Sequence, residues 1–328
     1  MNKVLYIILI SLFSLTVISC AKKSSDDSKT NTDNTTTDNT TSSGLFVAVG
    51  AAGTLLTSSD GTTWNAQTSG TSNNLRAVAY GNSILVVVGY SGTVLRSTDG
   101  TTWNNATGIS GTTDNLTNVT YGNNTFMAVG GSGTIITSSD GITWTSKTSG
   151  TSENLWDVAY GNSTWVANGD NGTIISSSDG TSWDNRTSGT TVEFNELLYG
   201  DSTFVAAGMS GTILTSSNGT SWTSRTSSTT NNLYGGVYTD SDSDGNKKFI
   251  LVGASGKVLS SNSTYTSWTP IDLSSISTGN LFGIARGGTT WVIVGASGYI
   301  STISDSESDV TTRTSDTTED LRRVFYKE

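Results

Sequence analysis

SSDGTTW, residues 58–64, decides the fold, because close variants of it return along the whole body of the chain. The variants end at Trp103, Trp144, Trp183 and Trp222, and a looser one, SNSTYTSW, ends at Trp268. A second marker, the last glycine of a VG-x-x-G-like segment, falls at Gly53, Gly92, Gly133, Gly172, Gly211, Gly256 and Gly298. These glycines are separated by 39 to 45 residues.

The repeat length and its internal pattern predict a β-propeller. Periods of roughly 40–45 residues with several short strands each are typical of propeller blades. Apolar residues alternate with a period of two, β-branched residues are frequent, and Gly, Asn and Ser interrupt the runs, as in short strands joined by turns. No segment after residue 20 has the spacing of an amphipathic helix. The sequence therefore predicts an all-β fold.

One repeat shows the four strands expected of each blade. We predict these strands at residues 75–80, 84–89, 93–97 and 102–107. Asp99-Gly100 predicts a hairpin with a primed turn, which requires positive φ at both central residues. The Trp that opens the outermost strand is expected to cover this turn and fill the gap to the next blade.

The two ends of the body together supply one blade. LFVAVG, from Leu45, matches a second strand, so the first unit lacks its innermost strand. DLRRVFYKE, residues 320–328, aligns with NLRAVAYGN, residues 74–82, and supplies it. We predict a ring of seven four-stranded antiparallel blades, closed by residues 321–326 joining residues 45–68, which leaves no blade incomplete. The last turn segment, residues 304–310, has lost its Gly and Trp.

The first part of the chain reads as a leader and a tether. Residues 1–19 contain Lys3 and then an apolar run, as in a signal peptide. The run ends in Val-Ile-Ser-Cys20, which resembles the lipobox of bacterial lipoproteins, and Cys20 is the sole cysteine of the sequence. The alternative is an ordinary secretory signal. Residues 20–44 are Ser, Thr, Asn and Asp-rich, and we expect a disordered tether ahead of the propeller at 45–328.

This reading predicts a lipid anchor on Cys20 and a place in the cell envelope. The residue after the cysteine is Ala21 rather than an acidic residue, which favours the outer membrane or cell surface over the inner membrane. We expect the protein to be a monomer that is attached to the membrane through this lipid.

The repeated SSDGTTW stretches resemble the Asp-box (BNR) repeats of sialidase-like propellers, although the familiar box carries one more residue between Asp and Gly. Seven such repeats in a lipoprotein also resemble the propellers of photosystem II assembly factors. In those propellers the box lies at the periphery, away from the active or binding face. The resemblance therefore implies that the box is structural.

Function is sought where the repeats differ from one another. The residue after the repeated Leu varies, as Arg76, Thr117, Trp156, Asn195, Tyr234, Phe282 and Arg322. The residue after the VG-like pair varies too, as Ala51, Tyr90, Gly131, Asp170, Met209, Ala254 and Ala296. In propellers both sites border one face around the axis. Aromatic residues and Arg crowded on a rim are typical of binding surfaces for a protein or glycan, although they could instead fill the central channel.

Blade four departs most from the repeat. Its second strand carries Asn168 where other blades have an apolar residue, and Trp156, Asp157 and Asp170 are expected nearby. Asn168 could contact a ligand, or it could be paired by a local hydrogen bond. The predicted ligand-binding set is Arg76, Tyr90, Trp156, Asp157, Asn168, Asp170, Met209, Tyr234, Phe282 and Arg322.

An acidic turn at 240–246 is a weaker candidate for a metal site. Asp240, Asp242 and Asp244 have the spacing of the start of a calcium loop. The resemblance fails downstream, where Lys248 and Leu251 stand in place of the expected acids. Calcium is thus the one possible cofactor, and the alternative is an ordinary acidic surface turn.

The composition argues against catalysis and against nucleic acid. The sequence has no His, which is the usual base near neutral pH. Arg186, Arg225 and Arg313 recur at one outer-strand position and read as surface residues, whereas Arg76, Arg322 and Arg323 are expected on the rim. We therefore expect a binding module and no enzyme, the alternative being a degenerate sialidase-like glycoside hydrolase. A net charge of −10 disfavours nucleic acid.

The anchor gives a first testable prediction. Cys20→Ser removes the sulfur that would carry the lipid, so the variant should be unprocessed or released from the membrane. Detergent-phase partitioning of the two proteins measures this. A correctly cleaved Cys20→Ser protein that still enters the detergent phase would disprove the lipoprotein interpretation.

Overall fold

The computed structural model describes residues 44–106, 108–109, 112–240, 245–273, 276–304 and 310–328. The predicted signal peptide, Cys20 and the tether up to residue 43 lie outside these residues, as do Asp242 and Asp244 of the acidic turn. Within the described part of the chain, no helix is long and apolar enough to cross a membrane.

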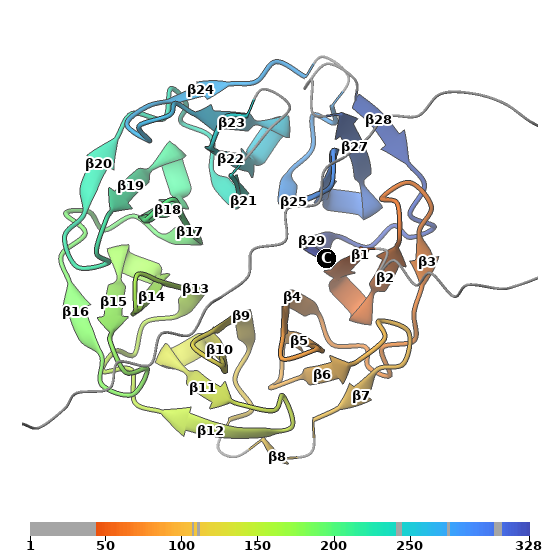
Figure 1. Cartoon of the computed structure of the whole chain (residues 1–328), viewed down its shortest axis with the longest axis horizontal. Coiled ribbons are helices and arrows are strands. Elements are labelled where there is room, and N and C mark those ends of the chain that lie inside the picture. Colours follow the sequence, from red (N-terminus) through yellow and green to blue (C-terminus); the bar gives the residue numbers. More distant parts are fainter. Residues whose placement is uncertain (1–43, 107, 110–111, 241–244, 274–275, 305–309) are drawn as a thin grey trace, which may run out of the picture. The chain divides into compact units, whose positions relative to one another are not determined.

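The described residues form a ring of seven antiparallel sheets, which confirms the predicted propeller (Figure 1). We number the blades from the one that contains β1. The innermost strands, in blade order, are β29 (Leu321–Lys327), β4 (Leu75–Gly81), β9 (Leu116–Gly122), β13 (Leu155–Gly161), β17 (Phe194–Gly200), β21 (Leu233–Thr239) and β25 (Leu281–Gly287). The second strands are β1 (Leu45–Gly50), β5 (Ile84–Gly89), β10 (Thr125–Gly130), β14 (Thr164–Gly169), β18 (Thr203–Gly208), β22 (Lys248–Gly253) and β26 (Thr290–Gly295).

The outer half of each blade is shorter. The third strands are β2 (Leu55–Ser58), β6 (Val94–Ser97), β11 (Ile135–Ser138), β15 (Ile174–Ser177), β19 (Ile213–Ser216), β23 (Val258–Ser261) and β27 (Ile300–Ser304). The outermost strands are β3 (Asn65–Ala66), β7 (Asn104–Asn105), β12 (Thr143–Lys147), β16 (Asp184–Arg186), β20 (Thr223–Arg225), β24 (Trp268–Pro270) and β28 (Val310–Arg313).

Two kinds of element are present in addition to the four strands of each blade. An additional strand, β8 (Gly108–Ile109), pairs in parallel with the outermost strand β12 of the next blade. Single 3-10 turns join the second and third strands in six blades, and they are the only helical elements among the described residues. They are η1 (Ala51–Gly53), η2 (Gly131–Gly133), η3 (Asp170–Gly172), η4 (Met209–Gly211), η5 (Ala254–Gly256) and η6 (Ala296–Gly298).

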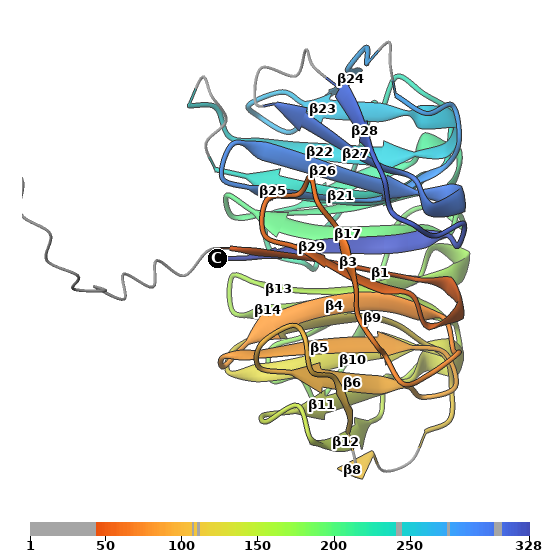
Figure 2. The same cartoon turned by 90° about the vertical axis from the view of Figure 1, so that its right-hand side faces the viewer.

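The ring closes as predicted, because the C-terminal strand β29 completes blade one. It pairs antiparallel with β1, with Phe46 opposite Tyr326 and Ala48 opposite Val324. Leu321 is fully buried and Val324 nearly so, whereas Tyr326 is only partly buried. Figure 2 shows the C-terminus at one face of the ring.

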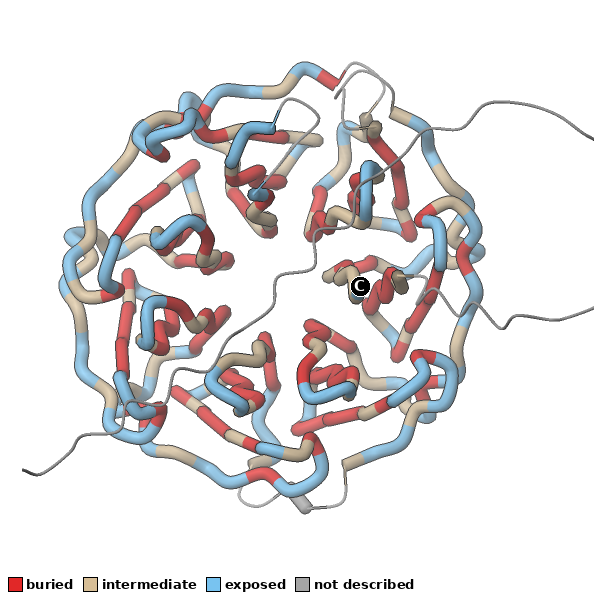
Figure 3. The backbone as a smooth tube through the Cα atoms, in the orientation of Figure 1, coloured by how far each residue is buried: buried red, intermediate tan, exposed pale blue. Residues whose placement is uncertain are grey.

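The core lies between blades, which explains why the second strands are nearly all apolar. Successive side chains of a strand point to opposite faces of its sheet. In β1, Val47 and Val49 pack against blade two, whereas Phe46 and Ala48 pack against blade seven. Both faces of the second strand are therefore covered, and Figure 3 shows buried residues concentrated inside the blades.

The repeated turn forms differently from the primed hairpin that the sequence predicted. Between β2 and β3, Ser58 Oγ accepts a hydrogen bond from the Gly61 N–H (2.8 Å), and Asp60 Oδ1 accepts one from the Thr62 N–H (2.8 Å). Gly61 has φ +74°, but Asp60 has no positive φ, so the prediction of a primed turn is wrong. The Asp side chain satisfies the backbone of a longer loop instead, which removes the need for a two-residue turn.

The Gly and Trp of this turn join neighbouring blades, as expected. A Cβ on Gly61 would lie 2.9 Å from Val292 of blade seven, so a side chain there would collide with that blade. Trp64 Nε1 donates to the Gly61 carbonyl (3.0 Å), and its ring lies 6.3 Å from that of Phe46. Trp64 belongs to the core shared by blades one and seven. The repeated stretch is structural.

Removal of residues 320–328 tests the shared blade. The truncation deletes β29, and burying side chains such as Leu321 and Val324 contributes about 1.5–3 kcal/mol each. With the exposed edge of β1 also free to pair with other molecules, we expect aggregation or unfolding, measured by size-exclusion chromatography and thermal melting. Removal of residues 22–40 is the control and should change neither. A soluble monomer with an unchanged melt after truncation would contradict the shared blade.

Candidate functional site

A β-bulge in every innermost strand gathers one side chain per blade around the axis. In β13, Leu155 pairs with Gly169 and Asp157 with Asn168, so Trp156 between them has no partner. The same irregularity follows the first residue of the other innermost strands. Bulges re-aim side chains.

These bulged residues line a cavity of about 370 Å³, here called the upper mouth. Its walls include Arg76, Thr117, Trp156, Asn195, Tyr234, Phe282 and Arg322, the complete first variable site of the sequence. Five of these residues were predicted to bind a ligand, and the side chain of each is partly exposed: Arg76, Trp156, Tyr234, Phe282 and Arg322.

The cations of the upper mouth come from the adjacent blades one and two. The Arg76 guanidinium lies 5.6 Å from the centre of the Tyr90 ring and 5.9 Å from that of Trp156. Burial lowers the pKa of Arg76, as do the positive charges of Arg322 and Arg323, whereas Tyr90 raises it. Among the described residues, no carboxylate lies within ion-pair distance of Arg76.

Arg322 is held more firmly than Arg76. Its guanidinium lies 4.3 Å from the centre of the Phe282 ring and pairs with Asp320 (2.9 Å). Phe282 in turn packs against Tyr234, with ring centres 5.6 Å apart. The upper mouth thus places the paired Arg322, and Arg76 without a carboxylate partner among the described residues, beside aromatic walls.

Asp170, the predicted site residue from η3, orients Trp156. Its Oδ1 accepts a hydrogen bond from Trp156 Nε1 (2.5 Å), and its Oδ2 accepts one from Asn154 Nδ2 (2.9 Å). The hydrogen bond to Asp170 therefore fixes the orientation of the Trp156 indole, which faces Arg76. Asp170 itself is not among the residues that line the cavity.

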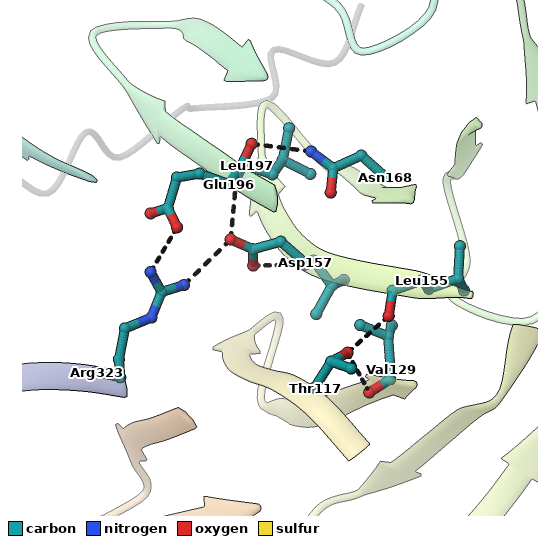
Figure 4. Close-up of polar contacts among 9 residues, drawn as sticks. Thr117, Val129, Leu155, Asp157, Asn168, Glu196, Leu197 and Arg323 are labelled. Carbon is teal, nitrogen blue, oxygen red and sulfur yellow. Dashed lines mark hydrogen bonds and ion pairs between the residues drawn. The ribbon is translucent and has the colours of Figure 1, made fainter. Parts of the chain in front are cut away.

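Three charged side chains of the innermost strands, here called the charged layer, contact one another next to the upper mouth (Figure 4). Arg323 Nη2 lies 3.1 Å from Asp157 Oδ2, and its Nη1 lies 2.5 Å from Glu196 Oε2. The carboxylate side chains are 2% and 1% exposed. The layer joins the C-terminal strand β29 to blades four and five.

Backbone and amide groups complete the charged layer. Asp157 accepts hydrogen bonds from the N–H groups of Val158 (2.7 Å) and Leu197 (2.9 Å). Asn168 Nδ2 donates to the Glu196 carbonyl (2.9 Å), and Asn168 is 0% exposed. This hydrogen bond to the next blade pairs the Asn168 amide nitrogen, whereas the buried Asn168 Oδ1 has no hydrogen-bond partner. Asn168 does not line the upper mouth.

The charged layer shifts the pKa values of its members. Burial raises the pKa of Asp157, against the attraction of Arg323. Burial also raises the pKa of Glu196, to about 8, and the nearby Asp157 charge adds to the rise while Arg323 opposes it. Burial alone would lower the pKa of Arg323, but the two carboxylates raise it.

Beyond the charged layer the channel opens into a second cavity of about 430 Å³, here called the lower pocket. Its walls include the apolar residues Val78, Val119, Val158, Leu197, Ile284 and Val324. Asp157 and Glu196 border this pocket alone, whereas Arg323 borders both cavities. The repeated SSDG turns lie toward this second face, since Ser58 is opposite Phe46 and Phe46 opposite Tyr326.

The other residues that the sequence analysis singled out lie outside the upper mouth. Met209 begins η4, where its N–H donates to the Glu193 carbonyl (3.0 Å), and it does not line the cavity. Arg186, Arg225 and Arg313 bond to hydroxyls of third strands. Within the described residues, no group of acids, His or Cys could hold a metal ion, and the described Asp240 is exposed.

Sequence reasoning misplaced Arg323 and missed Glu196. Arg323 was expected on the rim, but its side chain is 19% exposed and lies in the charged layer. The sequence did contain a signal for the charged layer, because the third residue of the innermost strand is charged in three of the seven blades. In blade order the third residues are Arg323, Ala77, Asn118, Asp157, Glu196, Gly235 and Gly283.

Comparison with known proteins supports the fold. The family model of the DUF6242 beta propeller domain matches residues 70–157. No curated protein matches the sequence. A solved structure of YCF48 bound to D1 peptide is similar, with a TM-score of 0.59 and 17% identity over 75% of this chain and 84% of that chain.

Two further structures are similar. YCF48 from Cyanidioschyzon merolae has a TM-score of 0.58 and 17% identity over 75% of this chain and 87% of its own. The computationally designed Ika8 protein has a TM-score of 0.60 and 13% identity over 85% and 92% of the two chains. At these identities the likeness concerns the fold, and the chain is similar to propellers with both natural and designed sequences.

The charged layer predicts how stability depends on pH. The pKa of Glu196 is raised from 4.5 to about 8 in the folded protein, so the folded chain binds more protons than the unfolded chain between these values. Stability should therefore fall as pH rises through this window, by at most about 1.4 kcal/mol per pH unit for one group. Thermal melting between about pH 5 and 8.5 measures the slope.

Glu196→Gln should flatten this slope, and the exposed Glu319→Gln is the matched control, which should keep it. A wild-type melting temperature that rises across the window, or a Glu196→Gln slope equal to that of the wild type, would contradict the assignment.

Proposed function

We propose that this chain is a binding module of the cell envelope that captures an acidic segment of a partner protein in the upper mouth. The observation that carries the proposal is the arrangement of Arg76 and Arg322 on adjacent blades beside Trp156, Tyr234 and Phe282. Aromatic residues and Arg dominate the binding energy of protein interfaces. A guanidinium without a carboxylate partner, such as that of Arg76, gains most from an incoming carboxylate.

The cavity has the form of a small-ligand or side-chain site. Its volume of about 370 Å³ falls in the range of pockets that bury most of a ligand. Arg323 of the charged layer lines the cavity as well. YCF48, a similar propeller, has a structure with a bound D1 peptide, which supports a peptide as the class of ligand.

The same geometry gives less support to a glycoside hydrolase. That reaction requires two accessible carboxyl groups on either side of the scissile bond. Among the described residues that line the upper mouth, Asp320 is the one acid, and it is paired with Arg322. Asp157 and Glu196 are buried against Arg323.

Single substitutions in the upper mouth test the proposed function. Arg76→Ala and Trp156→Ala should each weaken capture of the partner from envelope extracts by about tenfold or more, because such residues contribute about 2 kcal/mol at the centre of interfaces. Both side chains are partly exposed, so the melting temperature should change little. Binding is measured with the full chain on beads.

Arg225→Ala on outer strand β20 is the matched control and should bind as the wild type does. The proposed function fails if both mouth variants retain full binding, or if the control loses as much as they do. A large fall in melting temperature for Trp156→Ala would show that the ring fills the channel rather than contacting a ligand.

A further inference from the structure

We propose that binding of an acidic group in the upper mouth is coupled to the uptake of a proton by the Asp157–Glu196 pair, with Arg323 as the link. This inference rests on the proposed function and adds its regulation by pH.

The first argument is the position of Arg323. Arg323 lines both the upper mouth and the lower pocket. Asp157 and Glu196 each engage one of its terminal nitrogens. An acidic group that enters the upper mouth therefore meets a cation already shared by two carboxylates.

The second argument is the charge of the layer. Two carboxylates and one guanidinium carry one excess negative charge when both acids are ionised, and the acids are almost fully buried. Carboxylates that share a site cannot both ionise easily, so the pair retains a proton to higher pH than a single exposed acid does. The pKa of Glu196, raised to about 8, agrees with this geometry.

The third argument is the effect of a ligand carboxylate. Arg76 and Arg322 attract it from the walls, but an ionised Glu196 beneath Arg323 repels it. Protonation of Glu196 removes this repulsion and leaves Arg323 free to interact more strongly with the ligand. By linkage, the ligand raises the pKa of Glu196 further and takes up protons as it binds. Binding should therefore strengthen as pH falls through about 8.

Other charged and titratable groups surround the charged layer. Around the charged layer, β4 contributes Arg76, β29 contributes Arg322, and the loop before it contributes Asp320. Arg286 and six tyrosines border the lower pocket. The tyrosines are Tyr80, Tyr121, Tyr160, Tyr199, Tyr238 and Tyr326. Burial raises the pKa of Tyr238 and lowers that of Arg76, and the sequence has no His.

The experiment uses the full chain and a rhodamine-labelled, N-acetylated oligoglutamate peptide, whose side chains stay ionised above about pH 6. Fluorescence anisotropy should show binding about tenfold weaker at about pH 9 than at about pH 6. Glu196→Gln should bind at both pH values as tightly as the wild type does at the lower one. The exposed Glu319→Gln, on the loop before β29, should keep the wild-type pH dependence.

Calorimetry of the wild-type chain in two buffers of different ionisation enthalpy gives a second readout that does not depend on a variant. It should report uptake of a fraction of a proton per bound peptide near pH 8. Binding that is equal at both pH values, or without proton uptake, overturns the coupling but leaves the proposed function intact. Absence of binding at any pH overturns the proposed function and the coupling with it.

Discussion

The contact of Arg323 with Asp157 and Glu196 is the interaction on which the rest of the molecule depends. It joins the last strand of the chain to blades four and five across the axis, and so connects blades that are not neighbours in the ring. Removing one partner from such a buried group leaves an uncompensated charge and costs far more than the net contribution of the intact group. Arg323 lines both the upper mouth and the lower pocket, whereas its two partners line the lower pocket alone.

The charged layer is asymmetric because the strands approach the axis unequally. Blades six and seven carry Gly235 and Gly283 at the third position of their innermost strands. A Cβ at Gly235 would lie 2.3 Å from the Phe282 carbonyl oxygen, and one at Gly283 would lie 3.1 Å from the Arg323 Cα. Close backbone contact on this side leaves no room for side chains, so the charged groups that fill the axis come from blades one, four and five.

Much of the fold could be predicted from the sequence, because each repeat carries its own signal. The spacing of the glycines indicated the blades, and the match of residues 320–328 to residues 74–82 indicated the shared blade. The primed turn was wrong because the Asp60 side chain satisfies the backbone in a way that the dipeptide alone does not reveal. The charged layer was missed because Arg322 and Arg323 are consecutive, and only the bulge in β29 decides which of them borders the mouth and which enters the channel. Its partners are distant in sequence and become neighbours only when the ring closes.

The central claim is that Glu196 is held in an almost fully buried, shared-charge environment at the centre of the ring. An NMR titration of the Glu196 side-chain carboxyl carbon, in protein labelled with ¹³C-glutamate and assigned with the Glu196→Gln variant, tests it most directly. The account predicts an apparent pKa of about 8 for this carboxyl. A titration near the ordinary value of about 4.3 would contradict it, because it would show that burial and the Asp157 charge do not outweigh the attraction of Arg323.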